Sequence, residues 1–281
     1  MSQVLEKYAK LQASIAETGS LLVAYSGGLD STFLLRVAHD ILGDKVLAVT
    51  ARSSTYPERE YNEAAAYAKA IGARHVVITS EELDIPGFSE NPKDRCYYCK
   101  KELFTKLRAI ADEHGIARIA DGSNVDDLGD YRPGRTAARE CAVRSPLADA
   151  GLTKMEIRQL SKQLGLATWD KPSFACLSSR VPYGDRITPD KLRMIDEAEA
   201  FLIAAGFRQV RVRHHGDTAR IEVPKQDIVR MLDDGMRSRV VEKLKGLGFA
   251  YITIDLEGYR TGSMNEVLLR KEKSREMTNG R

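Results

Sequence analysis

Short apolar runs alternate with amphipathic helical patterns over the first two thirds of the chain. The runs at residues 21–25, 45–50, 75–79 and 117–120 predict buried strands. Residues 32–41, 57–71 and 97–114 repeat with the helical period, and a glycine follows each of the last two segments. This order predicts an α/β fold, a doubly wound parallel sheet with helices on both faces.

The pattern changes towards the C-terminus. Residues 153–164 predict a helix that opens with a capping box, and residues 167–189, dense in Pro, Ser and Gly, predict a long loop. A helix at 190–204, a hairpin of strands 209–213 and 220–223 turning at 215–217, and a β-rich run at 250–255 follow. We expect two domains, residues 1–187 and a small α+β substrate or oligomerisation domain, 188–281, with residues 270–281 frayed.

Composition limits the classes of partner. The 281 residues are 43% hydrophobic and 30% charged, and the net charge of +3 is too small for a general nucleic-acid scaffold but suits a phosphorylated small molecule. No apolar run approaches the ~20 residues that cross a bilayer, and residues 1–17 lack a secretory signal. We expect a soluble, cytoplasmic protein with no nucleic-acid or membrane partner, whose four cysteines serve metal binding or reactivity rather than disulfides.

A glycine turn follows the first predicted strand. The segment Ser-Gly-Gly-Leu-Asp-Ser at residues 26–31 leads into a helix, so its backbone N–H groups and the helix N-terminus can converge on an anion. Asp30 would repel that anion unless it binds Mg²⁺, which predicts a metal-bridged pyrophosphate. The lysine of a Walker A motif is absent, and an ordinary glycine-rich turn is the alternative. The candidate nucleotide-binding residues here are Ser26, Gly27, Gly28, Asp30 and Ser31.

Further candidates follow other predicted strands. Thr50 and Gly122 lie at the carboxyl edge of the sheet, where doubly wound folds bind ligands; Thr50 is expected to contact adenine, and Gly122 to let the backbone approach the nucleotide. Arg211 and Arg213 point to one face of a strand and could hold a phosphate or an acyl-adenylate, or form a solvated basic surface. Asp126, Asp127 and Asp130 could bind Mg²⁺ or form ordinary turns.

The cysteines have different settings. Cys96 and Cys99 form a C-x-x-C pair at the start of a predicted helix, whose dipole favours thiolates for disulfide exchange, zinc or an iron–sulfur cluster. Cys176 lies in the long loop, where a thiol can move and where Lys171 or Arg180 could stabilise a thiolate. Cys141 is expected to have a buried structural role in a helix.

Several motifs together resemble a known family. The glycine turn resembles the PP-loop of the N-type ATP pyrophosphatases, which implies cleavage of ATP between its α- and β-phosphates. With it, Pro-Ser-Phe-Ala-Cys-Leu-Ser-Ser-Arg at 172–180, the aspartate-rich segment at 121–134 and Arg-Val-Arg-His-His-Gly-Asp at 211–217 resemble the LarE family. These ATP-dependent sulfur transferases build the nickel-pincer nucleotide cofactor of lactate racemase, and the likeness runs in order along nearly the whole chain.

The resemblance implies that a carboxylate of a pyridinium mononucleotide is adenylated and then converted to a thiocarboxylate. In one form of the family the residue matching Cys176 gives up its own sulfur. In another form three cysteines bind a [4Fe–4S] cluster, and Cys96, Cys99 and Cys176 match that form, unless the first two are a resolving or structural pair. The implied catalytic set is Cys176, Asp30, Arg211 and Arg213, with ATP, Mg²⁺ and the cluster as cofactors. A homo-oligomer is also implied, with a hexamer as the candidate.

Three other functions compete with this one. A tRNA thiolase with a PP-loop would need a broad basic surface or an added RNA-binding domain. A glutamine-dependent amidotransferase would need a glutaminase domain, or a nucleophile in place of Ser2. A nucleotide or iron–sulfur sensor without catalytic activity would bind these ligands and release no pyrophosphate.

Overall fold

The computed structural model describes residues 2–129 and 133–266. The chain divides into two compact units, residues 1–174 and 175–281. Residues 175–187, expected in the first domain, are therefore grouped with the second unit, where Leu177, Arg180 and Val181 are buried. The segment expected to be frayed, 270–281, lies outside the described residues.

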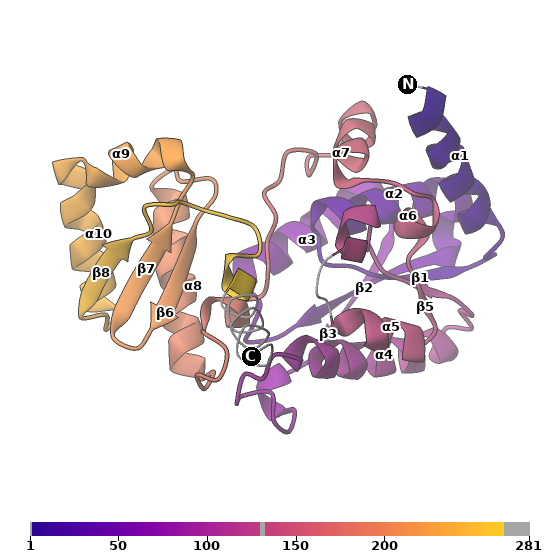
Figure 1. The fold of residues 1–281 in the computed structure, drawn as a ribbon. Helices are drawn as coiled ribbons and strands as arrows, with labels where there is room; N and C mark the ends of the chain where they lie inside the picture. The colour runs from indigo at the N-terminus through magenta and orange to yellow at the C-terminus, as the bar shows by residue number, and fades with distance from the viewer. Residues whose placement is uncertain (1, 130–132, 267–281) are drawn as a thin grey trace, which may run out of the picture. The chain divides into compact units, whose positions relative to one another are not determined.

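A five-stranded parallel sheet forms the centre of the first unit (Figure 1). Its strand order is β3-β2-β1-β4-β5, so β1 lies in the middle between β2 and β4. The strands are β1 (Leu21–Ala24), β2 (Val46–Arg52), β3 (Arg74–Thr79), β4 (Ile119–Ala120) and β5 (Val143–Arg144). The four expected strands are confirmed in place, and β5 is an addition too short to have a recognisable period.

Helices cover both faces of this sheet. Leu21 and Val23 of β1 pack into one apolar cluster with Phe33, whereas the intervening Leu22 packs into a second cluster with Phe104. Figure 1 accordingly shows α4 and α5 on the opposite side of the sheet from α1, α2 and α7. The helices are α1 (Ser2–Ala16), α2 (Leu29–Leu42), α3 (Glu58–Ile71), α4 (Arg95–Glu113), α5 (Gly134–Glu140), α6 (Pro146–Asp149) and α7 (Lys154–Gln163). The expected doubly wound α/β fold is confirmed.

The second unit is a small α+β structure. Its sheet has the order β6-β7-β8, in which β6 (Arg211–His215) and β7 (Thr218–Glu222) form the expected antiparallel hairpin and β8 (Tyr251–Ile254) runs parallel to β7. The same unit contains three helices, α8 (Pro189–Ala204), α9 (Ile228–Leu232) and α10 (Asp234–Gly246). A separate apolar cluster that includes Phe207, Val212, Ile221, Leu244 and Phe249 forms its core.

No helix in the described part of the chain combines the length and the apolar character that a bilayer crossing requires.

Candidate functional site

The phosphate loop joins the end of β1 to the start of α2. Gly27 has a φ of +68°, and a Cβ added there would lie 2.5 Å from the Cβ of Ala64 on α3. Glycine is therefore required at this position for two reasons, the left-handed backbone and the close contact with α3. The hydroxyl oxygens of Ser26 and Ser31 lie 3.1 Å apart, so the structure brings both predicted serines to one point.

Backbone donors at this turn are open to a ligand. Gly28 is the N-cap residue of α2 and supplies no side-chain cap. Among the hydrogen bonds of residues 2–129 and 133–266, none is donated by the N–H of Gly27 or of Gly28. Free amides at a helix N-terminus are suited to phosphate oxygens, which agrees with the predicted role of the turn.

Asp30 lies in the first turn of α2 with 21% of its side chain exposed. Its Oδ1 accepts a hydrogen bond of 3.1 Å from Asn124 Nδ2, and its Oδ2 lies 3.6 Å from Lys154 Nζ. Burial raises the pKa of Asp30, and Lys154 only partly offsets this. A carboxylate held in such surroundings gains from a further cation, so the residue fits the predicted Mg²⁺.

Within the described ranges, no three His, Cys, Asp or Glu side chains gather closely enough to hold a metal ion by themselves. Because Mg²⁺ is ordinarily held by one or two carboxylates together with phosphate oxygens and water, the Mg²⁺ site at Asp30 stays a prediction.

Gly122 and Thr50 have contacts that differ from those expected. A Cβ at Gly122 would lie 2.9 Å from Ser31 N, so the close approach that this glycine permits is to the start of α2. Thr50 lies inside β2, because that strand runs on to Arg52, and its side chain is buried. The Thr50 hydroxyl donates to Tyr25 O at 2.8 Å and lies 2.8 Å from His75 Nε2. The nucleotide contacts of both residues stay predictions.

The carboxylates of two aspartates after β4 accept backbone hydrogen bonds. Asp126 Oδ2 accepts from Lys154 N at 2.8 Å, and Asp127 Oδ2 accepts from Asn124 N at 3.1 Å. The Asp127 bond is local and fits the turn role, and the Asp126 bond joins this segment to the start of α7, so the Mg²⁺ role of the two residues stays a prediction. Asp130 lies outside the described residues.

Two residues from outside the glycine turn contact the phosphate loop. Tyr56 donates its hydroxyl to Ser26 O at 2.8 Å, and Lys171 donates its ammonium to Gly27 O at 3.4 Å. Lys171 also pairs with Glu63 at 2.7 Å and with Glu60 at 2.9 Å. Lys171 was expected to stabilise the Cys176 thiolate, whereas these bonds engage its ammonium with Gly27, Glu60 and Glu63.

The C-x-x-C pair lies at the start of α4, as predicted, where the i, i+3 spacing puts both thiols on one helix face. Cys96 is exposed, and Cys99 is half-buried with its Sγ 3.7 Å from Glu82 Oε1. Burial raises the pKa of Glu82. Cys141 directly follows α5 and packs, partly buried, against the apolar cluster on the α4 face, in keeping with a structural role.

Cys176 belongs to the second unit, and its backbone is anchored there. The buried Arg180 forms two 2.9 Å bonds to the carboxylate of Glu199, and its Nη1 donates to Cys176 O at 3.0 Å. Glu199 Oε1 also accepts from Val212 N at 3.0 Å. Arg180 was expected to stabilise a thiolate on a movable loop, whereas these bonds show it holding the backbone beside the thiol to α8.

Arg211 and Arg213 are buried rather than solvated, which rules out the basic-surface alternative. The guanidinium of Arg213 forms bonds of 3.0 and 2.8 Å with Glu222 and donates to Ser179 O at 2.7 Å. Burial, with the nearby charge of Arg180, lowers the pKa of Arg211 to about 10. Their predicted contact with substrate stays a prediction.

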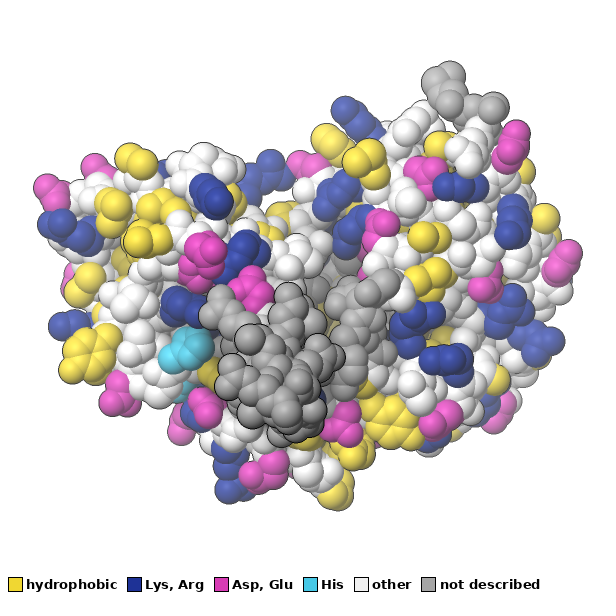
Figure 2. All heavy atoms as spheres, in the orientation of Figure 1, with side chains coloured by type: hydrophobic (Ala, Val, Ile, Leu, Met, Phe, Trp, Pro, Cys, Tyr) yellow, Lys and Arg dark blue, Asp and Glu magenta, His cyan; other side chains and the backbone are white. Residues whose placement is uncertain are grey.

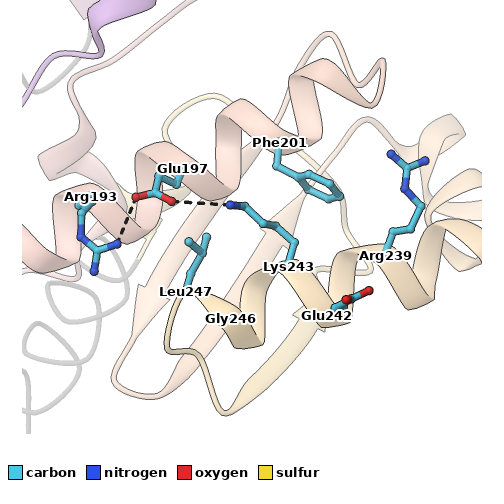
Figure 3. A pocket seen from close by; sticks show the side chains of 8 residues that line it. All are labelled: Arg193, Glu197, Phe201, Arg239, Glu242, Lys243, Gly246 and Leu247. Atoms are coloured by element: carbon cyan, nitrogen blue, oxygen red, sulfur yellow. Dashed lines mark hydrogen bonds and ion pairs between the residues drawn. The ribbon is translucent and has the colours of Figure 1, made fainter.

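A pocket of about 630 Å³ lies between α8 and α10 of the second unit (Figure 3). It is lined by charged side chains, including the Glu197–Arg193 and Glu197–Lys243 pairs, and by Phe201. None of the predicted site residues lines it.

The chain has relatives among known proteins. No protein-family model matches the chain. It is 39% identical to the pyridinium-3,5-bisthiocarboxylic acid mononucleotide synthase of Lactiplantibacillus plantarum over 97% of this chain and 98% of that protein. It is 44% identical to an uncharacterized protein of Synechocystis, over 93% of this chain and 98% of the relative, and 30% identical to one of Methanocaldococcus jannaschii, over 92% and 98%. With this identity over nearly its full length, and with the PP-loop in place, the chain belongs to the LarE family.

Proposed function

We propose that the protein is an ATP-dependent sulfur transferase that converts a carboxylate of a pyridinium mononucleotide to a thiocarboxylate for the nickel-pincer cofactor. The phosphate loop carries the proposal, because open amides, a helix N-terminus and a half-buried aspartate meet there. The relationship to a pyridinium bisthiocarboxylate synthase supports the choice of substrate.

The proposed reaction has two steps. A carboxylate oxygen of the substrate attacks the α-phosphorus of ATP, the bond from that phosphorus to the oxygen shared with the β-phosphate breaks, and pyrophosphate leaves. The loop amides would stabilise the charge on the pyrophosphate, and Asp30 would hold a Mg²⁺ ion that offsets the same charge. Sulfur then attacks the acyl carbon, and AMP leaves with the former carboxylate oxygen. Each round converts one ATP, one carboxylate and one sulfide-level sulfur to AMP, pyrophosphate and one thiocarboxylate. With Cys176 as the donor, its Sγ bonds to the acyl carbon, and its Cβ–Sγ bond then breaks by elimination, which leaves the residue as dehydroalanine. With a cluster-bound sulfide as the donor, the protein chain is unchanged.

Cys176 is the proposed centre of the sulfur chemistry, either as the donor itself or as a cluster ligand. Cys96 and Cys99 fit two thiolate ligands, since they share one face of α4 and one is exposed. A [4Fe–4S] cluster held by these three cysteines would supply an iron without a protein ligand, on which an extra sulfide can be carried. Arg211 and Arg213 are the proposed residues for the substrate phosphate.

Pyrophosphate release tests the enzyme directly. We expect release that requires ATP, Mg²⁺ and a pyridinium carboxylate mononucleotide together; its absence would instead favour a sensor. Anaerobic reconstitution should give the visible absorbance of a cluster, which Cys96→Ala, Cys99→Ala and Cys176→Ala each abolish. Absorbance that survives all three changes would exclude this ligand set.

The tRNA thiolase alternative is less well supported. Figure 2 shows basic and acidic side chains interspersed on the visible faces of the units rather than one broad basic surface. Retention of tRNA that weakens steeply with salt would revive it. The homo-oligomer, with a hexamer as candidate, is a prediction that light scattering checks, and the cytoplasmic location is one that fractionation checks.

A further inference from the structure

Three successive carbonyls of the phosphate loop are each occupied by a donor. Ser26 O accepts from the Tyr56 hydroxyl at 2.8 Å, and Gly27 O accepts from the Lys171 ammonium at 3.4 Å. Gly28 O accepts from Thr32 N at 3.0 Å, which is the first bond of α2. Two side chains and one helix bond thus fix the directions of three neighbouring peptide groups.

The direction of each carbonyl sets the direction of an amide. In a planar trans peptide the C=O and the N–H of the next residue point in opposite directions, and no peptide bond in the described chain is cis. When Tyr56 holds Ser26 O, the Gly27 N–H must point away from Tyr56. When Lys171 holds Gly27 O, the Gly28 N–H must likewise point away from Lys171. These are the two amides that donate no hydrogen bond among the described residues.

Both side chains are themselves held in place. The Tyr56 ring packs edge-on against Phe174 at a centroid distance of 5.5 Å. Lys171 is 11% exposed and is paired with Glu60 and Glu63 of α3. Burial by itself would lower the pKa of Lys171, but the two carboxylates outweigh it and raise the pKa, so the ammonium stays charged. Without such support, Gly27 and Gly28 would be free to rotate their peptides, because glycine has few steric limits.

We infer that Tyr56 and Lys171 are positioning residues, which hold the carbonyls of Ser26 and Gly27 so that the amides of Gly27 and Gly28 face the pyrophosphate part of ATP. The inference rests on the proposed ATP-pyrophosphatase function. In this inference, two residues outside the glycine turn preorganise the anion site of that turn.

Binding of three ligands to the full chain tests the inference. Tyr56→Phe removes only a hydroxyl, and Lys171→Met removes only the ammonium. Each change should weaken binding of MgATP and of inorganic pyrophosphate about three- to tenfold, the value of one hydrogen bond. AMP binding should not change, because AMP lacks the β- and γ-phosphates. In pyrophosphate release, KM for ATP should rise while kcat at saturating ATP stays nearly constant.

Two control variants separate positioning from simpler causes. Tyr61→Phe removes a hydroxyl from the nearby helix α3, on a ring that lies beneath the guanidinium of Arg52, and should leave all three affinities unchanged. Lys171→Met combined with Glu63→Gln restores the net charge of the Lys171, Glu60 and Glu63 group without restoring the bond to Gly27 O. This double variant should bind pyrophosphate as weakly as Lys171→Met alone.

The outcomes are distinct. Affinities for MgATP and pyrophosphate that stay at the wild-type level in Tyr56→Phe and Lys171→Met would overturn the inference and leave the proposed function intact. The inference would also be overturned if AMP binding weakened as much as pyrophosphate binding. Full recovery of pyrophosphate affinity in the charge-balanced double variant would overturn it as well. A wild-type protein that neither binds MgATP nor releases pyrophosphate would overturn the proposed function, and the inference with it.

Discussion

Asp30 lies where its negative charge is unfavourable to the fold. Its side chain is mostly buried, its neighbours Asn124 and Lys154 compensate in part, and its pKa is raised. A raised pKa in the folded state means that folding disfavours the ionised carboxylate, so this residue opposes stability at neutral pH. Such a residue is expected where charge serves ligand binding rather than folding.

Replacing Asp30 by Asn should therefore separate stability from activity. We expect Asp30→Asn to be no less stable than the wild type in urea unfolding, since the neutral amide avoids the cost of burying a charge. Pyrophosphate release should fall by roughly 100-fold or more, because the proposed Mg²⁺ ligand is lost. Full activity in this variant would remove Asp30 from the site.

At the scale of elements, segments with a strong local pattern were predictable and short ones were not. The strand at 21–25 and the capping box of α7 were visible in the sequence, and the structure confirms both. The two-residue strand β5 is too short to show a hydrophobic period. It forms through pairing within the sheet, which the local sequence does not indicate.

The candidate site follows the same rule. The phosphate loop could be predicted because its residues are adjacent in sequence. The contacts of Tyr56 and Lys171 with the loop could not be predicted, because both residues are far from it in sequence, and Lys171 was assigned to the Cys176 thiolate instead. For Arg213, the alternation of residues along the strand predicted the face on which its side chain lies. It did not predict that Glu222 of β7 would bind its guanidinium.

The N-terminus of α7 offers a test at this scale. Thr153 N donates to Glu156 Oε2 at 2.8 Å, and Thr153 Oγ1 accepts from Glu156 N at 3.3 Å. Thr153→Ala should lower the free energy of unfolding by about 1 kcal/mol, because one helix N–H loses its partner. Chemical denaturation measures this, with Thr105→Ala on exposed α4 surface as a comparison expected to have a smaller effect. Equal effects at the two positions would contradict the capping role.

At the scale of the whole molecule, the two units have separate cores, and the second depends on a buried charge pair. Burial alone would raise the pKa of Glu199, but Arg180 outweighs it and lowers the pKa. A lowered folded pKa gives stability that is present above the unfolded value, about 4.3 for Glu, and is lost as the pH falls through the folded pKa. The backbone beside Cys176 depends on the same pair through Arg180.

Acid should therefore loosen the second unit in a way that depends on Glu199. Amide hydrogen exchange across that unit should accelerate as the pH falls below about 4.3, after correction for the intrinsic rate. Glu199→Gln should lower stability at pH 7 by about 3–5 kcal/mol, because Arg180 is left buried without its counter-charge, and should flatten the acid response. An unchanged acid response in this variant would show that other groups cause it.

The most direct test of sulfur transfer is mass spectrometry of product and protein after reaction of Cys176→Ala with ATP, Mg²⁺ and the pyridinium carboxylate mononucleotide. We predict that the variant still releases pyrophosphate, because the phosphate loop is intact, and that it forms no thiocarboxylate above background. Thiocarboxylate formed at the wild-type level by Cys176→Ala would contradict the central role of this cysteine.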